Sequence, residues 1–573
     1  MSSIRGHKII VGVDYGTTFT GRDSLQLQVN RSTALAHNMV GVSFVNSSQG
    51  AENIHVIRTW PGPARVQDET WKTPSRIAYK RENLSLGEQD VAWGYQVTPR
   101  MKSYTWTKLL LDNQKKHILS IEDLDIIQGH GLLAVPSFKR QPREVCADYL
   151  AEIYTYIISY LERRLTHEIL GETSLVFYFT IPAIWSDKAK QDTWDAARVA
   201  GFGSRPKDDI NMITEPEAAA LATFSSFSNN LAHVMKAGES VLICDCGGGT
   251  VDIVTYLITQ VQPVFKFEEV LIGTGGKCGS SYIDRNFHRW MSETFGSAFD
   301  TLRFEKKGPG SVFMKSFEAE KRDFGASQTL NKTFEIDLVM QGVSSSTNYN
   351  AEDGLVTVVL VGGFGDSPWL FGILNRWCLK RSITLVCPED PQASVVKGAA
   401  LQGLNNMRPQ KRKARVHYGF SLRMDFREGI DPESESYISP WDGAKLCSNR
   451  ISWVIEKGTA IGQGDDLPYH WLERVHKGTD GSLESSIQLY TCYADSAPDW
   501  YDILTYHNIG VINYKFEVAD LPKLRRKSTA DGGSMWLLEF RITIDLLATK
   551  GILEFKVLGL DNKKIGEASI EYI

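Results

Sequence analysis

The chain has 573 residues, which is too many for one hydrophobic core and enough for two or three large units. Hydrophobic residues make up 42% of the chain and charged residues 23%, a composition that excludes a disordered or fibrous protein. The 63 basic and 68 acidic residues give a formal net charge of −5, which excludes a general electrostatic attraction to nucleic acid or to an acidic membrane surface.

Targeting signals and cysteine usage favour a reduced, cytoplasmic protein. No segment has the pattern of a signal peptide, and none approaches the roughly 20 apolar residues that span a bilayer. The eight cysteines are scattered without a regular set of spacings, which favours free thiols over structural disulfides. Cys244 and Cys246 would point to the same face of a strand, and no second pair stands at zinc-finger spacing, so a metal role is not expected.

The first 400 or so residues alternate short apolar runs with amphipathic stretches, which predicts an α/β fold. The apolar runs at residues 8–14 and 241–245 each end in an acidic residue before a glycine turn, so each predicts a strand followed by a tight turn. Between them, residues 143–165 and 186–200 carry apolar side chains at helical spacing and predict two helices.

The C-terminal region reads as strands and turns. Residues 538–544 alternate apolar and polar side chains, and residues 553–557 repeat this pattern after a turn, which predicts a hairpin in an antiparallel β-domain. A basic segment with the sequence RPQKRKAR, at residues 408–415, separates the two regions. We interpret it as a solvated linker, and a nuclear-import or anion-binding patch is the alternative.

The first candidate phosphate site is the sequence Val11-Gly-Val-Asp14-Tyr-Gly16-Thr17-Thr18, an apolar strand that ends in an acid, a glycine and two hydroxyls. A glycine lets the backbone approach a phosphate closely, successive N–H groups bind its oxygens, and the acid can hold a metal ion through water. The alternative is a strand-to-turn boundary that binds nothing.

A second motif, Cys244-Asp245-Cys246-Gly247-Gly248-Gly249-Thr250-Val251-Asp252, repeats this arrangement and adds another acid. Three consecutive glycines lose much backbone entropy on folding, which favours a turn that wraps around a ligand. Two such turns facing each other would hold a polyphosphate from both sides. Phosphoryl transfer depends on positioning and charge neutralisation, which paired acids and a magnesium ion would supply.

Together these two turns resemble the phosphate-binding hairpins of the actin-like ATPase superfamily. Leu360-Val-Gly362-Gly363-Phe364-Gly365 resembles the adenosine turn of that superfamily. Three further segments, residues 179–183, 196–201 and 213–220, resemble the linking segment of DnaK-type proteins. The order of these motifs identifies the chain as a divergent member of the DnaK-type 70-kilodalton heat-shock chaperone family.

The resemblance implies a two-lobed α/β nucleotide-binding domain of the actin-like ATPase (ribonuclease-H-like) fold over residues 1–407. A basic linker over residues 408–416 would follow, and residues 417–573 would form an antiparallel β-sandwich that resembles the chaperone substrate-binding domain, without its helical lid. Residues 22–41 interrupt the family pattern between the first turn and the strand expected after it, so they are a candidate insertion.

The resemblance also implies the roles of individual residues. Asp14 and Asp252 would hold Mg²⁺ through its water shell, and Asp245 and Glu215 would orient the attacking water. The residues expected to contact ATP or ADP are Gly16, Thr17, Thr18, Gly247, Gly248, Gly249, Thr250, Gly275, Gly276, Glu318, Lys321, Arg322, Gly362, Gly363 and Phe364. Helical spacing puts Glu318, Lys321 and Arg322 on one face of a helix. The alternative is that this face is solvated and binds nothing.

The chain departs from the family pattern at two functional positions. DnaK-type ATPases place a catalytic lysine in the segment that corresponds to residues 93–97, and no lysine stands there in this chain before Lys102. Hydrolysis is therefore expected to be slow or absent even if ATP binds. Asp366 stands where an arginine that packs on the adenine is expected, which would weaken nucleotide binding.

These features favour an ATP-binding, ATP-hydrolysing chaperone whose nucleotide state controls the binding of polypeptide segments. The expected cofactors are ATP or ADP and Mg²⁺, and the expected partners are extended polypeptide clients and co-chaperones, with no nucleic acid and no membrane. Two alternatives remain. The missing lysine supports a pseudo-ATPase scaffold, and the same fold also occurs in small-molecule kinases, although a kinase would not explain the C-terminal β-region.

Overall fold

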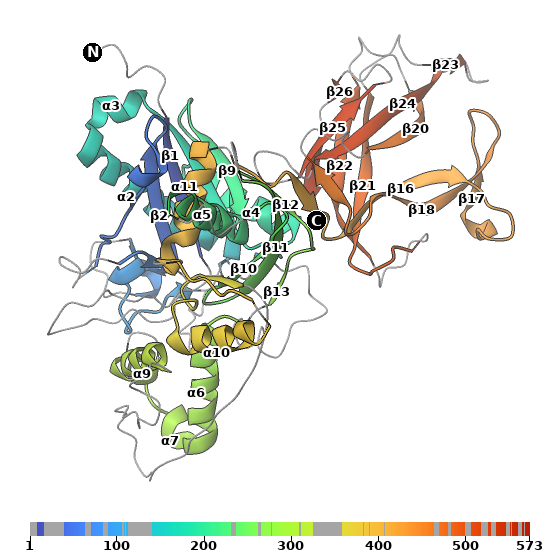
Figure 1. Ribbon diagram of the computed structural model, residues 1–573. Helices are drawn as coiled ribbons and strands as arrows, with labels where there is room; N and C mark the ends of the chain where they lie inside the picture. Colours follow the sequence, from blue (N-terminus) through green and yellow to red (C-terminus); the bar gives the residue numbers. More distant parts are fainter. Residues whose placement is uncertain are drawn as a thin grey trace. The chain divides into compact units, whose positions relative to one another are not determined.

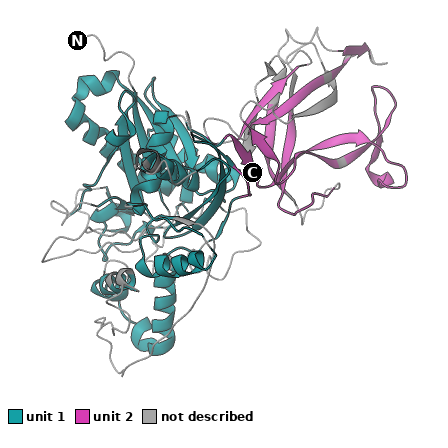
Figure 2. Cartoon of the chain, viewed as in Figure 1, with its two compact units in different colours: residues 1–268, 273–409 teal, residues 269–272, 410–573 magenta. Residues whose placement is uncertain are grey.

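The structure is a computed structural model, and Figure 1 shows its fold. It describes residues 8–16, 39–62, 70–83, 90–105, 108, 111–112, 140–230, 236–261, 265–276, 278–308, 311–324, 358–381, 383–388, 390–405, 407–462, 469–478, 483–498, 506–516, 525–528, 534–545, 551, 553–559, 564–566 and 568–572. The chain divides into two compact units (Figure 2). Unit 1 comprises Met1–Glu268 and Gly273–Pro409, and unit 2 comprises Glu269–Ile272 and Gln410–Ile573.

The first large sheet of unit 1 has the strand order β3-β2-β1-β8-β9, and β4 also pairs with β2. Its strands are β1 (Lys8–Tyr15), β2 (Met39–Asn46), β3 (His55–Val56), β4 (Thr73–Pro74), β8 (Ser174–Ile181) and β9 (Asp209–Thr214). β1 runs antiparallel to β2 and parallel to β8. Because β1 lies inside the sheet and is buried along nearly its whole length, it reads as an almost continuous apolar run.

The second large sheet of unit 1 has the order β12-β11-β10-β14, and β13 pairs with β11. Its strands are β10 (Ser240–Cys246), β11 (Val251–Gln260), β12 (Lys266–Glu269), β13 (Thr274–Gly276) and β14 (Val358–Val361). A smaller sheet joins β5 (Arg76–Tyr79), β6 (Val91–Trp93) and β7 (Tyr104–Thr105). The strands predicted at residues 8–14 and 241–245 are therefore confirmed as β1 and β10.

Two helices, α5 (Glu215–Asn230) and α11 (Pro391–Asn405), lie between the two large sheets of unit 1 (Figure 1). One hydrophobic cluster includes side chains from both helices and from both sheets, among them Ile10, Ala219, Ile243 and Ala399. The small residues of α5 and α11 let the two helices approach each other closely. This shared core connects β1 to β10, the two strands that end at the predicted phosphate-binding turns.

The remaining helices of unit 1 include both helices that the sequence predicts. They are α2 (Pro142–Leu165), α3 (His167–Glu172), α4 (Asp187–Val199), α6 (Ser281–Phe295), α7 (Ser297–Asp300), α8 (Phe304–Lys307), α9 (Val312–Asp323) and α10 (Pro368–Leu379). α4 begins after Ser186, whose hydroxyl accepts a hydrogen bond from the Ala189 N–H group as an N-cap. Among the described residues, no helix is both long and apolar enough to cross a bilayer.

Unit 2 consists of antiparallel sheets. The strands are β15 (Lys411–Lys413), β16 (His417–Asp425), β17 (Ser436–Ile438), β18 (Lys445–Ile455), β19 (Ala460–Gly462), β20 (Tyr469–Gly478), β21 (Leu483–Cys492), β22 (Tyr506–Phe516), β23 (Arg525–Ser528), β24 (Ser534–Asp545), β25 (Glu554–Leu558), β26 (Lys564–Gly566) and β27 (Ala568–Tyr572). One sheet has the order β17-β18-β16-β21-β22-β27 and another β20-β24-β25-β26. β24 and β25 form the predicted hairpin. Both sheets contribute side chains to one hydrophobic cluster, including Phe420 and Phe540.

Two expectations about segment boundaries need correction. Within the segment predicted as a basic linker, Lys411–Lys413 form β15 and pair with β19, so this part is a strand of unit 2. The predicted insertion at residues 22–41 extends too far, because Met39–Gly41 are the first residues of β2. Val40 pairs with Tyr15 and Gly41 pairs with Asp14. Residues 22–38 lie outside the described residues, and their assignment as an insertion remains a prediction.

Candidate functional site

The four acidic residues assigned to catalysis all lie at the ends of elements in unit 1. Asp14 is near the end of β1, Glu215 begins α5, Asp245 is near the end of β10 and Asp252 lies near the start of β11. Their exposed fractions are 2%, 7%, 6% and 1%, so all four carboxyl groups are buried. Asp245 and Asp252 are register partners in the β10–β11 pair. Burying this many carboxylates is costly unless cations, protons or hydrogen bonds compensate them.

Two buried lysines contact this group of acids. Lys72 Nζ lies 2.5 Å from Asp14 Oδ2, and Lys108 Nζ lies 3.2 Å from Glu215 Oε1. Lys108 has no exposed side-chain surface and also donates to the Tyr15 carbonyl. Four carboxylates against two ammonium groups leave an excess of two negative charges when all six groups are ionised. We name Asp14, Glu215, Asp245, Asp252, Lys72 and Lys108 the acid cluster.

Both lysines were missed by the sequence analysis, which expected a cation only at residues 93–97. The signal that could have found them is local: Lys72 stands between a tryptophan and a Thr-Pro pair, and Lys108 precedes three leucines. A lysine in such an apolar context is rarely solvated along its whole length. Aromatic rings also surround Lys108, whose Nζ lies 5.2 Å from the ring centre of Tyr15 and 5.0 Å from that of Trp185.

The acid cluster raises the pKa of two of its carboxyl groups. Burial raises the pKa of Glu215 to about 7; Lys108 opposes this change, and Asp252 and Asp14 add to it. Burial also raises the pKa of Asp245 well above its usual value, with further contributions from Glu215, Asp252 and Asp14 and opposition from Lys72. The site therefore favours the protonated form of both groups, and the arrival of a cation would favour their ionisation.

Hydrogen bonds hold the other two acids in place. The Thr180 hydroxyl on β8 donates to Asp14 Oδ1 at 2.7 Å. The Ala183 backbone N–H group donates to Asp252 Oδ1 at 3.2 Å. Hydrogen bonds of this kind fix the orientation of a carboxyl group.

Glycines line the turn between β10 and β11. The Gly247 N–H group donates to the Thr250 carbonyl at 3.0 Å and closes the turn. Gly279 packs tightly on this turn, so a Cβ atom on Gly279 would overlap the main chain of Gly248. A Cβ atom on Gly275 would lie 2.5 Å from the Val251 carbonyl oxygen. The neighbouring Ser280 hydroxyl is fully buried and has no hydrogen-bond partner among the described residues. The loop thus offers a polar group to a ligand.

The predicted adenosine turn after β14 lies directly beside Asp245. Gly362 has φ +82°, a conformation that favours glycine, and a Cβ atom there would overlap Asp245 Oδ1. The Phe364 N–H group donates to the Cys246 carbonyl at 2.9 Å, which joins this turn to the end of β10. Gly363, between these two residues, is buried. Asp366 accepts a hydrogen bond from Gln392 Nε2 at 3.0 Å.

Glu318 and Lys321 on α9 form a second charged group with Asp284 on α6. Lys321 Nζ lies 2.5 Å from Glu318 Oε2 and 2.7 Å from Asp284 Oδ1. Burial lowers the pKa of Lys321, but these two carboxylates outweigh it and raise the pKa overall. Both α9 residues are buried, so the alternative of a solvated helix face is wrong for them. Asp284 was missed by the sequence analysis.

Some predicted contact residues are not described. Thr17 and Thr18 lie outside the described residues, as does the side chain of Arg322. Gly16, directly after β1, is described, and its N–H group donates to the Met39 carbonyl at 2.9 Å. Gly276 pairs with Val251, and Gly275 pairs with Asp252, so β13 brings both glycines beside the acid cluster.

The cysteine pair behaves as the sequence predicts. Cys244 and Cys246 point to one face of β10, with their sulfur atoms 3.5 Å apart. Across the part of the chain that the structure describes, no group of three or more His, Cys, Asp and Glu side chains is arranged to hold a metal ion.

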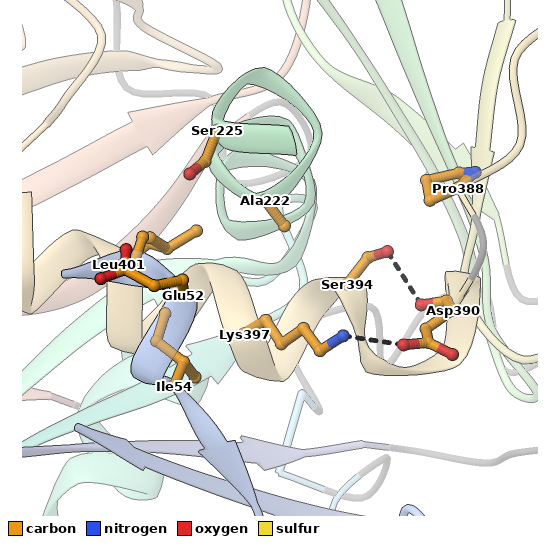
Figure 3. A pocket seen from close by; sticks show the side chains of 10 residues that line it. Glu52, Ile54, Ala222, Ser225, Pro388, Asp390, Ser394, Lys397 and Leu401 are labelled. Carbon is orange, nitrogen blue, oxygen red and sulfur yellow. Dashed lines mark hydrogen bonds and ion pairs between the residues drawn. The ribbon is translucent and has the colours of Figure 1, made fainter. Parts of the chain in front are cut away.

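A separate cavity of about 310 Å³ lies elsewhere in unit 1 (Figure 3). It is lined by Ala51, Glu52, Ile54, Ala222, Ser225, Pro388, Asp390, Ser394, Lys397 and Leu401. Figure 3 shows Lys397 and Ser394 both directed at Asp390, with an Nζ–Oδ2 distance of 2.8 Å for the ion pair. None of the predicted nucleotide-contact residues lines this cavity.

Comparison with known proteins gives the family. The Hsp70 protein family model matches residues 67–353, just over half of the chain, and this range includes both lysines of the acid cluster. The chain is 22% identical to heat shock 70 kDa protein 12B of Homo sapiens, over 85% of this chain and 81% of that protein. It is 20% identical to heat shock 70 kDa protein 12A of Mus musculus, over 80% of this chain and 78% of that protein.

A bacterial relative has similar coverage of this chain. The chain is 25% identical to the chaperone protein HscA homolog of Rickettsia peacockii, over 81% of this chain and 67% of that protein. The match to the family model, together with the sheets and helices of unit 1, confirms the resemblance: the chain is a divergent member of the Hsp70 family, whose fold is that of the actin-like ATPases.

Proposed function

We propose that unit 1 binds and slowly hydrolyses ATP at the acid cluster, and that the bound nucleotide controls the binding of polypeptide segments by unit 2. Membership of the Hsp70 family makes the chain an ATP-binding, chaperone-like protein. The observation that carries the location is the convergence of four buried carboxylates and two buried lysines beside glycine turns. Phosphoryl-transfer sites need this combination of charge and close backbone approach.

The residues present fit a magnesium–nucleotide complex. The cluster offers carboxylate oxygens, which suit Mg²⁺, and it gains negative charge when a bound cation displaces protons from Glu215 and Asp245. The buried Ser280 hydroxyl lacks a partner among the described residues. Asp14 and Asp252 would hold the ion through its water shell. The bound ion would neutralise phosphate charge. The phosphate contacts would come from Gly16, Thr17, Thr18, Gly247, Gly248, Gly249, Thr250, Gly275 and Gly276, and the adenosine contacts from Glu318, Lys321, Arg322, Gly362, Gly363 and Phe364.

Asp245 and Glu215 would orient the attacking water. A pKa of about 7 suits Glu215 to exchange a proton near neutral pH, as general acid–base catalysis requires, and burial shifts the pKa of Asp245 in the same direction. The Lys108 ammonium fixes Glu215 and limits the rise of its pKa. Gly362 leaves room for the Asp245 carboxylate beside the adenosine turn, so nucleotide binding and the position of this acid would be linked.

Unit 2 is proposed to be the client-binding part, a β-sandwich whose two larger sheets share one hydrophobic cluster. Extended polypeptides bind sheets through main-chain pairing and apolar pockets, so unfolded segments are the proposed clients. Co-chaperones that act on the nucleotide cycle are the further proposed partners, and the cytoplasm is the proposed location.

A pseudo-ATPase scaffold is the second candidate function. The absence of a lysine at residues 93–97 and the presence of Asp366 in the adenosine turn favour it. Lys72 and Lys108 weaken this alternative because they supply buried cations from other segments. A turnover assay separates the two functions, since only an enzyme loses phosphate release when Asp245→Asn is introduced.

Calorimetry with ATP and ADP in the presence of Mg²⁺ is the first test, on the intact chain and on Asp14→Ala. We expect binding by the intact chain and a loss of affinity in the variant, with retained binding but lost turnover in Asp245→Asn. The Asp187→Asn variant, which removes a carboxylate outside the acid cluster, is the control. An intact, folded chain that binds neither nucleotide would refute the proposed site.

A further inference from the structure

The carboxylate of Asp14 is already compensated by groups of the chain itself. Lys72 Nζ lies 2.5 Å from Oδ2, and the Thr180 hydroxyl donates to Oδ1 at 2.7 Å. Only 7% of the Lys72 side chain and 3% of the Asp14 side chain are exposed. A buried ion pair with this geometry holds a fixed positive charge at the position assigned to the water shell of Mg²⁺.

The strand pairing in the first sheet delivers Lys72 to this position. Asp14 pairs with Gly41 across β1 and β2, and Val40 next to it pairs with Thr73 of β4. Lys72 precedes Thr73, and its side chain crosses Gly41, where an added Cβ atom would lie 3.2 Å from Lys72 Cγ and 3.5 Å from Cε. A glycine opposite Asp14 thus leaves the space through which the lysine reaches the acid.

The main chain of Lys72 is held as well. Its carbonyl oxygen accepts hydrogen bonds from the Tyr95 hydroxyl at 3.1 Å and from the Thr70 hydroxyl at 3.2 Å. A lysine normally loses much rotamer entropy when it binds an anion. Because this side chain is buried and held at both ends, most of that entropy is lost on folding, and the ammonium is preorganised for a ligand.

Lys72 lies at the first of the turns that are assigned to the phosphates, where its ammonium group contacts Asp14 directly. An ammonium group has three N–H donors, so it can hold a carboxylate and a phosphate oxygen at the same time. In a water-poor site such a charge acts more strongly than it would in solvent.

We propose that Lys72 is a nucleotide-binding residue whose ammonium group contacts the phosphates, so that nucleotide affinity depends on Lys72 more than on Mg²⁺. This inference rests on the proposed function of the acid cluster. Where a metal ion is the main cation of a phosphate site, chelation removes most of the affinity. Here a fixed cation stays in the protein, and nucleotide binding persists without the ion.

The test is calorimetry with ADP on the full chain, in excess Mg²⁺ and in excess EDTA. We expect the Kd of the intact chain to change less than about 10-fold between the two conditions. Lys72→Met should weaken binding in EDTA by about 10- to 100-fold, the range for a lost hydrogen bond to a charged group, and should make affinity strongly dependent on Mg²⁺. Lys72→Arg should keep much of the binding in EDTA.

Lys190→Met is the matched control, because Lys190 is also partly buried and lies 3.0 Å from the Asp187 carboxylate, outside the acid cluster. It should bind ADP like the intact chain in both conditions. Circular dichroism and thermal melting check that each variant folds. If Lys72→Met does not fold, the Kd of the intact chain for ADP in Mg²⁺ and in EDTA still tests whether nucleotide binding persists without the ion.

The outcomes separate the two proposals. If the intact chain binds ADP in Mg²⁺ but its affinity for ADP falls more than about 100-fold in EDTA, the proposed role of Lys72 is overturned and the proposed function stands. A Lys72→Met variant that folds and binds ADP normally in EDTA would do the same. An intact chain that binds ADP in neither condition would overturn the proposed function, and the inference with it.

Discussion

Gly398 of α11 packs directly on Ala218 of α5, so closely that a Cβ atom on Gly398 would overlap the Ala218 carbonyl group. These two helices lie between the large sheets of unit 1 (Figure 1). The contact therefore sets how closely α5, which begins at Glu215, approaches α11. Any side chain at residue 398 would have to separate the two helices.

Gly398→Ala should therefore destabilise unit 1 by about 3 kcal/mol, the upper part of the range for overpacking a core. Urea unfolding followed by circular dichroism measures the change. Gly372→Ala is the matched control, since an added Cβ on α10 would meet only Arg376 Nη1, at 3.9 Å. That substitution should leave stability unchanged or increase it by up to about 1 kcal/mol, because alanine is the better helix former. Equal effects of the two substitutions would show that the α5–α11 contact tolerates separation.

At about pH 8, above the pKa of Glu215, Lys108→Met should destabilise the unliganded protein by about 1 to 2 kcal/mol, because the buried Glu215 carboxylate loses its cation and must take up a proton. Combining it with Glu215→Gln should recover part of the loss, since the amide carries no charge. A double-mutant cycle from denaturant unfolding gives the coupling between the two residues. If the double variant is as unstable as the sum of the two single variants, the ion pair contributes nothing measurable.

The unliganded protein should lose stability as the pH rises from about 4.5 to about 7, through the raised pKa of Glu215. In this window the folded chain holds a proton at Glu215 that the unfolded chain has released, so the free energy of unfolding falls with increasing pH. Glu215→Gln removes this titration and should reduce the dependence of Tm on pH over the same window, while the raised pKa of Asp245 keeps a slope of the same sign. The same slope in the variant and in the intact chain would assign the pH dependence to other groups.

Gly362→Ala should impair both stability and nucleotide binding, because the turn has φ +82° and an added Cβ would displace the Asp245 carboxylate. Gly238→Ala separates the two causes. Gly238 has φ +93° but nothing within 4 Å of an added Cβ, so this substitution should cost only about 1 kcal/mol, for the backbone conformation. ADP calorimetry and urea unfolding on both variants test the comparison. Normal ADP binding by a folded Gly362→Ala variant would contradict the place of this turn in the site.

Local sequence patterns predicted much of unit 1 correctly. The helices at Pro142–Leu165 and Asp187–Val199 have apolar residues at helical spacing, and the strands β1 and β10 are apolar runs that end at an acid and a glycine. In unit 2, the strands of the β24–β25 hairpin show the alternation of apolar and polar residues that is typical of a half-buried strand. Each of these signals lies within one stretch of chain, because helix and strand periodicity depend on neighbouring residues.

The sequence by itself determined the two acid–glycine turns, the α/β order of the first region and the antiparallel strands of the last. Only the tertiary structure decided which cations compensate the acids. Lys72 is 58 residues from Asp14, and Lys108 is 107 residues from Glu215. Apolar neighbours in the sequence indicate that both lysines are buried. Their partners depend on the register of β4 against β2 and on the packing of Lys108 beside Tyr15, Trp185 and α5, which no local pattern encodes. A lysine becomes part of a site only when folding removes it from water and places a carboxylate within reach.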